Sequence, residues 1–92
     1  MKKGLFVTFE GGEGAGKSTL ARRLQDALRN FHREVILTRE PGGTTFSEEL
    51  RNLLLHHKGH VASRAELFLF LSARIQHLEE LIKPSIHRGA IV

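Results

Sequence analysis

The feature that most constrains the fold is a glycine-rich segment at residues 11–18, which reads Gly-Gly-Glu-Gly-Ala-Gly-Lys-Ser. Before it, residues 5–9 form a short apolar run with β-branched members, the pattern of a buried strand. After it, apolar residues recur at helical spacing at Leu20, Leu24, Ala27, Leu28 and Phe31. A second β-branched run at 34–38 follows. The order strand, helix, strand predicts a βαβ unit with parallel strands and a right-handed crossover.

Two further helices are predicted downstream of this unit. The spacing Thr-Phe-Ser-Glu at 45–48 is that of a capping box and starts a short helix that ends near Leu55. A second box, Ser-Arg-Ala-Glu at 63–66, starts a longer helix whose apolar side carries Leu67, Leu71, Ile75, Leu78 and Ile82. Pro84 is expected to kink or restart that helix and Gly89 to end it.

The last residues, 90–92, have the composition of a third strand that has only begun. We therefore predict an α/β fold with a parallel sheet and helices on both faces, truncated after the start of the third strand. A chain of 92 residues is too short for two independent domains. Because two strands and the start of a third do not complete a doubly wound sheet, residues 1–92 are expected to be the N-terminal portion of a single domain.

Residues 11–18 match the pattern G-x-x-x-x-G-K-[ST] of a phosphate-binding loop, between a predicted strand and a predicted helix. Glycines let the backbone adopt positive φ and curl around an anion, where the positive end of the helix dipole also lies. Lys17 brings a full charge to the β and γ phosphates, and the Ser18 hydroxyl is a suitable Mg²⁺ ligand. The predicted binding residues for a purine nucleoside triphosphate are Gly11, Gly12, Glu13, Gly14, Ala15, Gly16, Lys17, Ser18 and Thr19.

A phosphate-binding loop alone does not distinguish a kinase from a GTPase, an ATPase motor or a recombinase. A kinase is favoured, because transfer to a small acceptor needs a second anion site and the chain offers arginines for one. Arg39 follows the second strand, and Arg51 and Arg74 lie on the two following helices. Arg74 follows Phe70 by four residues, so ring and guanidinium share a face that can hold an aromatic base. On the residues alone, solvated arginines and a core Phe70 remain alternatives.

Composition excludes several other classes. The chain has no cysteine, which excludes disulfides and thiolate chemistry and fits the cytoplasm. The apolar run near the N-terminus is interrupted by Glu10 and is too short for a signal peptide or a membrane span. The net charge of +4 favours an anionic ligand, but scattered basic residues without Tyr or Trp argue against a nucleic-acid-binding module. His56, His57 and His60 lack further ligands at a recognised spacing, so no metal site is assigned to them.

The chain resembles the N-terminal part of bacterial thymidylate kinases over nearly its whole length. The glycine-rich loop within 9–19 is common to many families, whereas Thr-Arg-Glu-Pro-Gly-Gly-Thr at 38–44 is much more specific. Glu-Leu-Arg at 49–51, Glu-Leu-Phe-Leu-Phe at 66–70 and Ala-Arg at 73–74 extend the match. The combination of these motifs carries the resemblance.

The resemblance implies a nucleoside-monophosphate-kinase fold and transfer of the γ-phosphoryl group of ATP, with Mg²⁺, to dTMP to make dTDP. It implies that Phe70 stacks on thymine and that Arg74 contacts the base or the phosphate side of the acceptor. Arg39 and Arg51 are implied at the acceptor phosphate. Glu13 is implied near the sugar 3′-hydroxyl and the metal region, so that Lys17 and Glu13 are the catalytic candidates and Ser18 the metal ligand.

Other parts of the family's pattern are not in these residues. An Asp-Arg pair follows the third strand in such kinases, whereas the sequence stops at Val92. Gly14 follows Glu13, so the resemblance implies the type whose catalytic arginine comes from a lid. We therefore expect these residues alone to have little or no kinase activity. The complete enzyme is expected to be a cytoplasmic homodimer that binds neither nucleic acid nor membrane; the alternative is a related small-molecule kinase with another acceptor.

Overall fold

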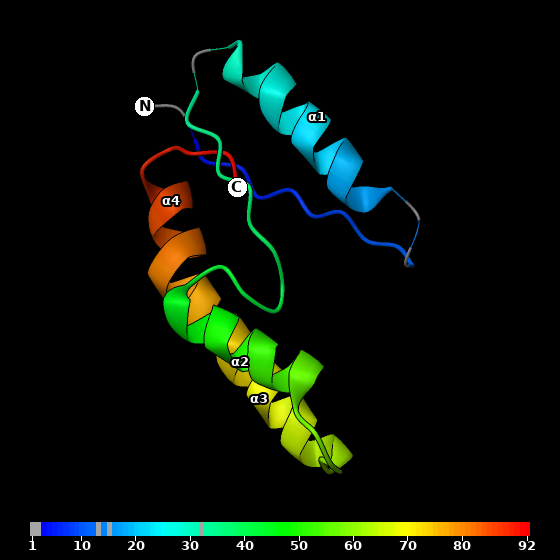
Figure 1. Ribbon diagram of the computed structural model, residues 1–92. Coiled ribbons are helices and arrows are strands. Elements are labelled where there is room, and N and C mark those ends of the chain that lie inside the picture. Colours follow the sequence, from blue (N-terminus) through cyan, green and yellow to red (C-terminus); the bar gives the residue numbers. More distant parts are fainter. Residues whose placement is uncertain (1–2, 13, 15, 32) are drawn as a thin grey trace. The chain divides into compact units, whose positions relative to one another are not determined.

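The computed structural model describes residues 3–12, 14, 16–31 and 33–92 (Figure 1). The helical elements in this part of the chain are α1 (Lys17–Arg29), α2 (Thr45–His56), α3 (Ser63–His77), the π-helical segment η1 (Leu78–Ile82) and α4 (Lys83–His87). None of the described helices is long and apolar enough to cross a membrane. The chain forms two compact units, Met1–Leu37 with Ser85–Val92 and Thr38–Pro84, which are taken in turn.

Three extended segments run parallel in the first unit. Residues 90–92 exchange backbone hydrogen bonds of 2.8–3.1 Å with residues 5–7. On their other side they exchange bonds of 2.8–2.9 Å with residues 34–36. The segment that is last in the sequence therefore lies between the first two, and all three point the same way, as the predicted parallel sheet requires.

Continuous strands do not form in the described residues, and in this respect the predictions for 5–9 and 34–38 are wrong. The pairing consists of isolated parallel bridges, Leu5 with Ile91 and Val35 with Ile91. Both runs pair with the same three residues, 90–92, so each side has too few partners to extend a ladder along the whole run. The apolar, β-branched pattern predicted extended backbone, but it did not reveal how much of that backbone finds a partner.

The side chains of two arginines link these extended segments through hydrogen bonds. The Arg33 guanidinium donates to the carbonyl oxygens of Lys3 at 2.7 Å and of Gly89 at 2.8 Å. Arg88 makes two hydrogen bonds to the Glu34 carboxylate, at 2.9 and 2.7 Å, and these bonds hold the pKa of Glu34 below its ordinary value. Charged side chains thus supply links between segments that have few backbone bonds.

The predicted helices are present, but their starts differ in detail from the capping boxes. Thr44, one residue before the predicted cap, caps α2: its Oγ1 accepts a hydrogen bond from the backbone N–H of Ser47 at 3.0 Å. Thr44 has extended dihedrals, whereas Thr45 is already helical. Ser63 is likewise the first helical residue of α3, and the cap position is Ala62, which has no hydroxyl to offer. The capping-box prediction at 63–66 is therefore wrong.

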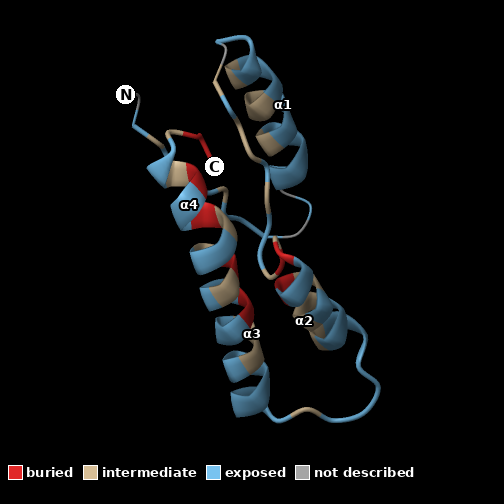
Figure 2. Ribbon diagram, turned by 90° about the vertical axis from the view of Figure 1, so that its left-hand side faces the viewer, coloured by how far each residue is buried: buried red, intermediate tan, exposed pale blue. Residues whose placement is uncertain are grey.

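In the second unit α2 and α3 lie side by side (Figure 2). Ser47 and Ala73 are both fully buried, and the Ser47 hydroxyl donates to the Ala73 carbonyl at 2.7 Å. Small side chains at this point let the two helices approach closely. The predicted apolar side is confirmed only at its C-terminal end: Leu67, Leu71 and Ile75 of α3 stay exposed, whereas Leu78 is half-buried and Ile82 is buried in η1. Spacing identified the helix, but small and polar residues occupy its contact with α2.

Pro84 restarts the long helix, as predicted. A proline has no N–H and its ring collides with the carbonyl four residues earlier in a regular α-helix. The chain widens into the π-helical segment η1 immediately before Lys83 and Pro84, and then resumes as α4. Gly89, with φ of 92°, lies two residues after His87, the last residue of α4, close to the helix end that the sequence predicts.

Candidate functional site

The glycine-rich loop has the backbone geometry that its sequence predicts. Gly14 and Gly16 have φ of 78° and 80°, in the left-handed region that favours glycine. Space does not forbid a side chain at either position, since a Cβ there would meet no atom within 4 Å. The backbone conformation is thus the constraint, as expected for a loop that must curl around a ligand. Glu13 and Ala15, two of the predicted loop residues, lie outside the described residues.

The start of α1 is suited to an anion. Its cap is Gly16, so no side chain caps the first N–H groups of this helix. The first turn contains no acidic residue, and Lys17, Ser18 and Thr19 are all exposed. The first N–H groups of a helix have no partner within it and lie at its positive end. The helix start therefore offers backbone N–H groups and a lysine ammonium to a phosphate. It also offers a hydroxyl oxygen to the cation that accompanies the phosphate.

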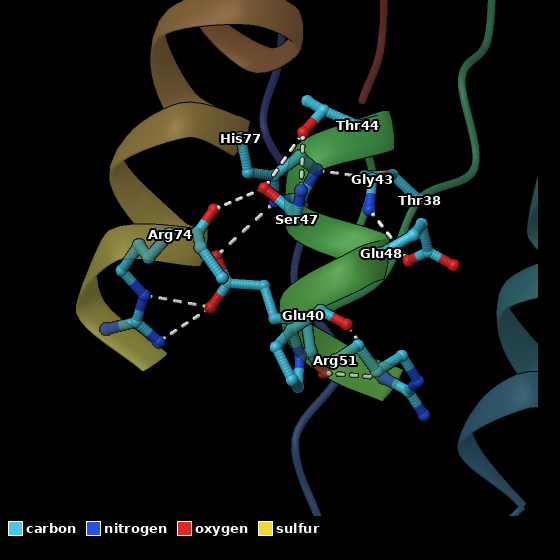
Figure 3. Close-up of polar contacts among 11 residues, drawn as sticks. Thr38, Glu40, Gly43, Thr44, Ser47, Glu48, Arg51, Arg74 and His77 are labelled. Carbon is cyan, nitrogen blue, oxygen red and sulfur yellow. Dashed lines mark hydrogen bonds and ion pairs between the residues drawn. The ribbon is translucent and has the colours of Figure 1, made fainter. Parts of the chain in front are cut away.

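A second cluster of charged residues lies in the second unit, where α2 and α3 meet the chain that precedes α2 (Figure 3). Arg39 pairs with Glu48 through two hydrogen bonds. These bonds hold the pKa of Glu48 below its ordinary value and raise that of Arg39; the backbone N–H of Gly43, 3.1 Å from Glu48 Oε2, adds to the first effect. Glu48 therefore ties the side chain of Arg39 and the backbone of Gly43 to α2.

Arg51 and Arg74 approach the same segment from different helices. Arg51 Nη1, from α2, donates to the Pro41 carbonyl at 2.9 Å. Arg74, from α3, donates from Nε and Nη2 to Glu40 Oε1 at 2.8 and 2.7 Å, and these bonds raise its pKa. The Arg74 guanidinium also lies 5.1 Å from the centre of the Phe70 ring, a cation–π distance.

The predicted acceptor residues thus form two groups within this unit. Arg39 and Arg51 line a cleft of about 880 Å³ that runs along α2 from Thr45 to His56, together with Gly43, Thr44 and Glu48. Phe70 and Arg74 form a ring-and-guanidinium pair on α3, and Phe70 is half-buried. Arginines that the sequence left as candidates are therefore held in defined positions by acidic or carbonyl partners.

Sequence reasoning missed three polar residues of this cluster, namely Glu40, Glu48 and His77. Glu40 is the acidic partner of Arg74, and Glu48 is that of Arg39. His77 is 1% exposed and lies beside Thr38 and Glu40. The available signal was the acidic residue within Thr-Arg-Glu-Pro-Gly-Gly-Thr, which needs a basic partner when it is not simply solvated. The sequence contained no comparable signal for His77, which lies on a helix side that looked polar.

Gly43→Ala should lower the free energy of unfolding by about 2–4 kcal/mol, because alanine is strained in the left-handed backbone conformation and its Cβ collides with the His77 ring. Gly43 has φ of 97°, and a Cβ there would lie 2.3 Å from two atoms of the His77 ring. Urea denaturation measures the change. Gly59→Ala is the matched control, because Gly59 has φ of 103° but its nearest Cβ contact is 4.0 Å away. Equal losses in the two variants would mean that packing on His77 adds nothing.

Glu48→Gln should reduce stability by about 0.5–1 kcal/mol at neutral pH, the usual range for a partly exposed ion pair. Because folding lowers the pKa of Glu48, its contribution is present above the ordinary glutamate pKa and is lost as pH falls through the lowered value. The difference between wild type and variant, measured by urea denaturation from neutral to acid pH, should therefore shrink on acidification. Glu49→Gln, the next residue of α2, is the control; a difference that grows in acid would contradict the assignment.

A glycine loop ending in Lys-Ser at the start of α1, beside parallel extended segments, defines the class of P-loop nucleotide-binding proteins. The family model described as thymidylate kinase matches residues 9–92. The chain belongs to the thymidylate kinase family and has its P-loop fold.

Individual relatives agree with this assignment. A thymidylate kinase of Protochlamydia amoebophila is 56% identical over 92 residues, which are 98% of this chain and 41% of that protein. One of Gluconobacter oxydans is 57% identical over 90 residues, or 98% of this chain and 42% of that protein. The crystal structure of thymidylate kinase from Ehrlichia chaffeensis matches with a TM-score of 0.90 at 41% identity and covers 98% of this chain and 51% of that one. The chain thus spans about two fifths of the length of the first two kinases and about half of the chain in the crystal structure.

Proposed function

We propose that these residues belong to a thymidylate kinase that transfers the γ-phosphoryl group of ATP to dTMP. In this reaction a phosphate oxygen of dTMP forms a bond to the γ-phosphorus while the bond from that phosphorus to the β-phosphate oxygen breaks, giving dTDP and ADP. Membership of the family supports the proposal. The observation that carries it is the start of α1, where a glycine cap, open N–H groups, Lys17 and Ser18 coincide.

We assign the donor side of the reaction to the glycine-rich loop. The backbone N–H groups of 11–19 hold the phosphates, and the Lys17 ammonium stabilises negative charge on the transferring group. Ser18 supplies a hydroxyl ligand to Mg²⁺, which neutralises phosphate charge when bound. Glu13, by resemblance, acts near the acceptor sugar and the metal. Support comes from the φ angles of Gly14 and Gly16 and from the absence of an acidic residue in the first turn of α1.

We assign the acceptor side to Arg39, Arg51, Phe70 and Arg74. Phe70 offers a planar face to thymine, and Arg74, bonded to Glu40 and lying over the ring, borders the same base. Arg39 and Arg51 place positive charge in the cleft along α2, where the acceptor phosphate would lie. The pairing of each arginine with an acidic or carbonyl group supports these roles, because it holds the guanidinium before a ligand arrives.

The finer features of the fold and assembly are proposals too. We propose that the parallel segments at 5–7, 90–92 and 34–36 belong to a nucleoside-monophosphate-kinase sheet with helices on both faces, within one domain. We also propose that the whole enzyme is a homodimer. A cytoplasmic location follows from the substrates, since ATP and dTMP are used for nucleotide synthesis there.

An acceptor panel tests the proposed function. A full-length kinase carrying these 92 residues is assayed for ADP formation with dTMP and with other nucleoside monophosphates under equal conditions. We expect the highest kcat/KM with dTMP. If dTMP is no better than the other acceptors, the alternative of a related small-molecule kinase replaces the proposal. If these residues alone, verified by mass, turn over ATP in a dTMP-dependent way, the expectation that they are inactive is wrong.

A further inference from the structure

His77 is a buried titratable residue to which the proposed mechanism gives no role. It is the last residue of α3, and its side chain is 1% exposed. Nε2 lies 2.7 Å from Thr38 Oγ1, and Nδ1 lies 3.5 Å from Glu40 Oε2 (Figure 3). Among the described residues Nδ1 has no hydrogen-bond partner, so the Glu40 carboxylate at 3.5 Å is a close polar contact and not a hydrogen bond. Since a buried polar atom without a partner is unfavourable, the Glu40 carboxylate is the group that this nitrogen requires.

The partners of the ring determine which nitrogen carries the proton. An ionised carboxylate only accepts hydrogen bonds, so the Glu40 carboxylate beside Nδ1 favours the tautomer with the proton on Nδ1. In a neutral imidazole Nε2 is then an acceptor, and the Thr38 hydroxyl donates to it. The Thr38 hydroxyl is therefore hydrogen-bonded to Nε2, and a proton on Nδ1 lies on the side of the ring that contacts the Glu40 carboxylate. The proton positions are assigned from these partners.

Glu40 connects this series to the acceptor site. Its Oε2 faces His77, while its Oε1 accepts both hydrogen bonds from the Arg74 guanidinium. That guanidinium lies over Phe70 at 5.1 Å. The Glu40 carboxylate thus contacts His77 through one oxygen and Arg74 through the other. Because His77 restricts the orientation of this carboxylate, it also restricts the positions that the Arg74 guanidinium can adopt.

The backbone of the same segment fixes the imidazole in turn. A Cβ at Gly43 would lie 2.3 Å from ring atoms Cδ2 and Nε2, so this backbone rests directly against the ring. The ring is therefore enclosed by Thr38, Glu40 and Gly43, which all belong to the segment that carries the family's most specific motif. A side chain at this place therefore lies between Thr38, which bonds Nε2, and Glu40, which contacts Nδ1.

We infer that His77 is a positioning residue of the acceptor site: through Glu40 it holds the Arg74 guanidinium in place over Phe70 for the thymine base. The inference rests on the proposed function, because it gives Arg74 the acceptor role assigned above. It differs from a packing role in one respect. A positioning role requires a polar atom at the place of Nδ1, because Nδ1 is the ring nitrogen that faces Glu40. A packing role does not depend on which of the two ring nitrogens a substitution replaces.

Two substitutions separate the nitrogens. The amide of Asn reaches the place of Nδ1, and that of Gln reaches the place of Nε2. In a full-length kinase carrying these residues, His77→Gln should raise KM for dTMP by about 3- to 10-fold, the effect of losing the polar contact between Nδ1 and Glu40. KM for ATP should not change, and His77→Asn should recover most of the affinity for dTMP. His87→Gln, at an exposed histidine of α4, is the control and should behave as wild type.

A double-mutant cycle identifies the path through Glu40. Glu40→Gln should raise KM for dTMP in the same way, and His77→Gln should add little to it. Several results would overturn the inference: equal effects of Asn and Gln at His77, a parallel rise in KM for ATP, or additive effects of the two substitutions.

A readout without substrate keeps this inference separate from the proposed function. The ¹H–¹⁵N resonance of Arg74 Nε–H should shift in His77→Gln and keep nearly its wild-type position in His77→Asn. An Arg74 resonance that is indifferent to His77→Gln would overturn the positioning role even if the enzyme phosphorylates dTMP. A wild-type enzyme without dTMP kinase activity would instead remove the proposed function, and the resonance would still decide whether His77 positions Arg74.

Discussion

Lys17→Ala should lower kcat for dTMP phosphorylation by about 100-fold or more in a full-length kinase carrying these residues, the usual effect of removing one preorganised charge. Lys17 is the first residue of α1, exposed, in a turn that contains no acidic side chain. Its ammonium adds a full charge where the helix offers only the partial charges of its N–H groups. Steady-state kinetics with saturating ATP and dTMP measures the loss of kcat.

Binding of dTMP separates this catalytic effect from general damage. Because Lys17 acts on the transferring phosphates, the dissociation constant of dTMP measured by calorimetry should be largely unchanged in Lys17→Ala. Lys58→Ala, in the exposed loop before α3, is the matched control and should keep the wild-type kcat. An unchanged kcat in Lys17→Ala would contradict the assignment of the glycine-rich loop, whatever the result for the acceptor.

The geometry of the glycine-rich loop and of the start of α1 could be predicted from the sequence because the residues that determine it are consecutive. A glycine at each position of positive φ and a lysine and serine at the start of a helix leave a signature that needs no long-range information. Helix positions followed from local spacing for the same reason. The start of α2 shifted by one residue because both Thr44 and Thr45 can cap, and only the backbone angles decide between them.

The charged cluster of the second unit was only partly predictable, since its contacts join residues far apart in the sequence. Arg74 and Glu40 are 34 positions apart, and His77 and Thr38 are 39 apart. Periodicity also favoured the large apolar residues of α3 as its packing side, whereas Ala73 and His77 are buried. A helix that approaches its neighbour through small residues leaves little apolar signal on the contacting side. Pairings of this kind become visible only when the fold brings the helices together.

Phe70→Ala should weaken dTMP binding by about 1–3 kcal/mol, the range for loss of one base–aromatic stack, and leave ATP binding unchanged. Phe70 is half-buried on α3, and the Arg74 guanidinium lies 5.1 Å from its ring centre. The substitution therefore removes both the face offered to thymine and the support beneath Arg74. Calorimetric titration of each substrate into the full-length kinase measures the two affinities separately.

Three further variants distinguish stacking from packing. Phe70→Leu keeps the apolar volume without the aromatic face, so it should lose dTMP affinity nearly as Ala does, whereas Phe70→Tyr should retain it. Phe68→Ala, on the same helix and 66% exposed, is the matched control and should bind both substrates as wild type does. If Leu restores the affinity, or if ATP weakens as much as dTMP, Phe70 is a packing residue. The thymine site would then have to be sought among residues other than the Phe70 and Arg74 pair.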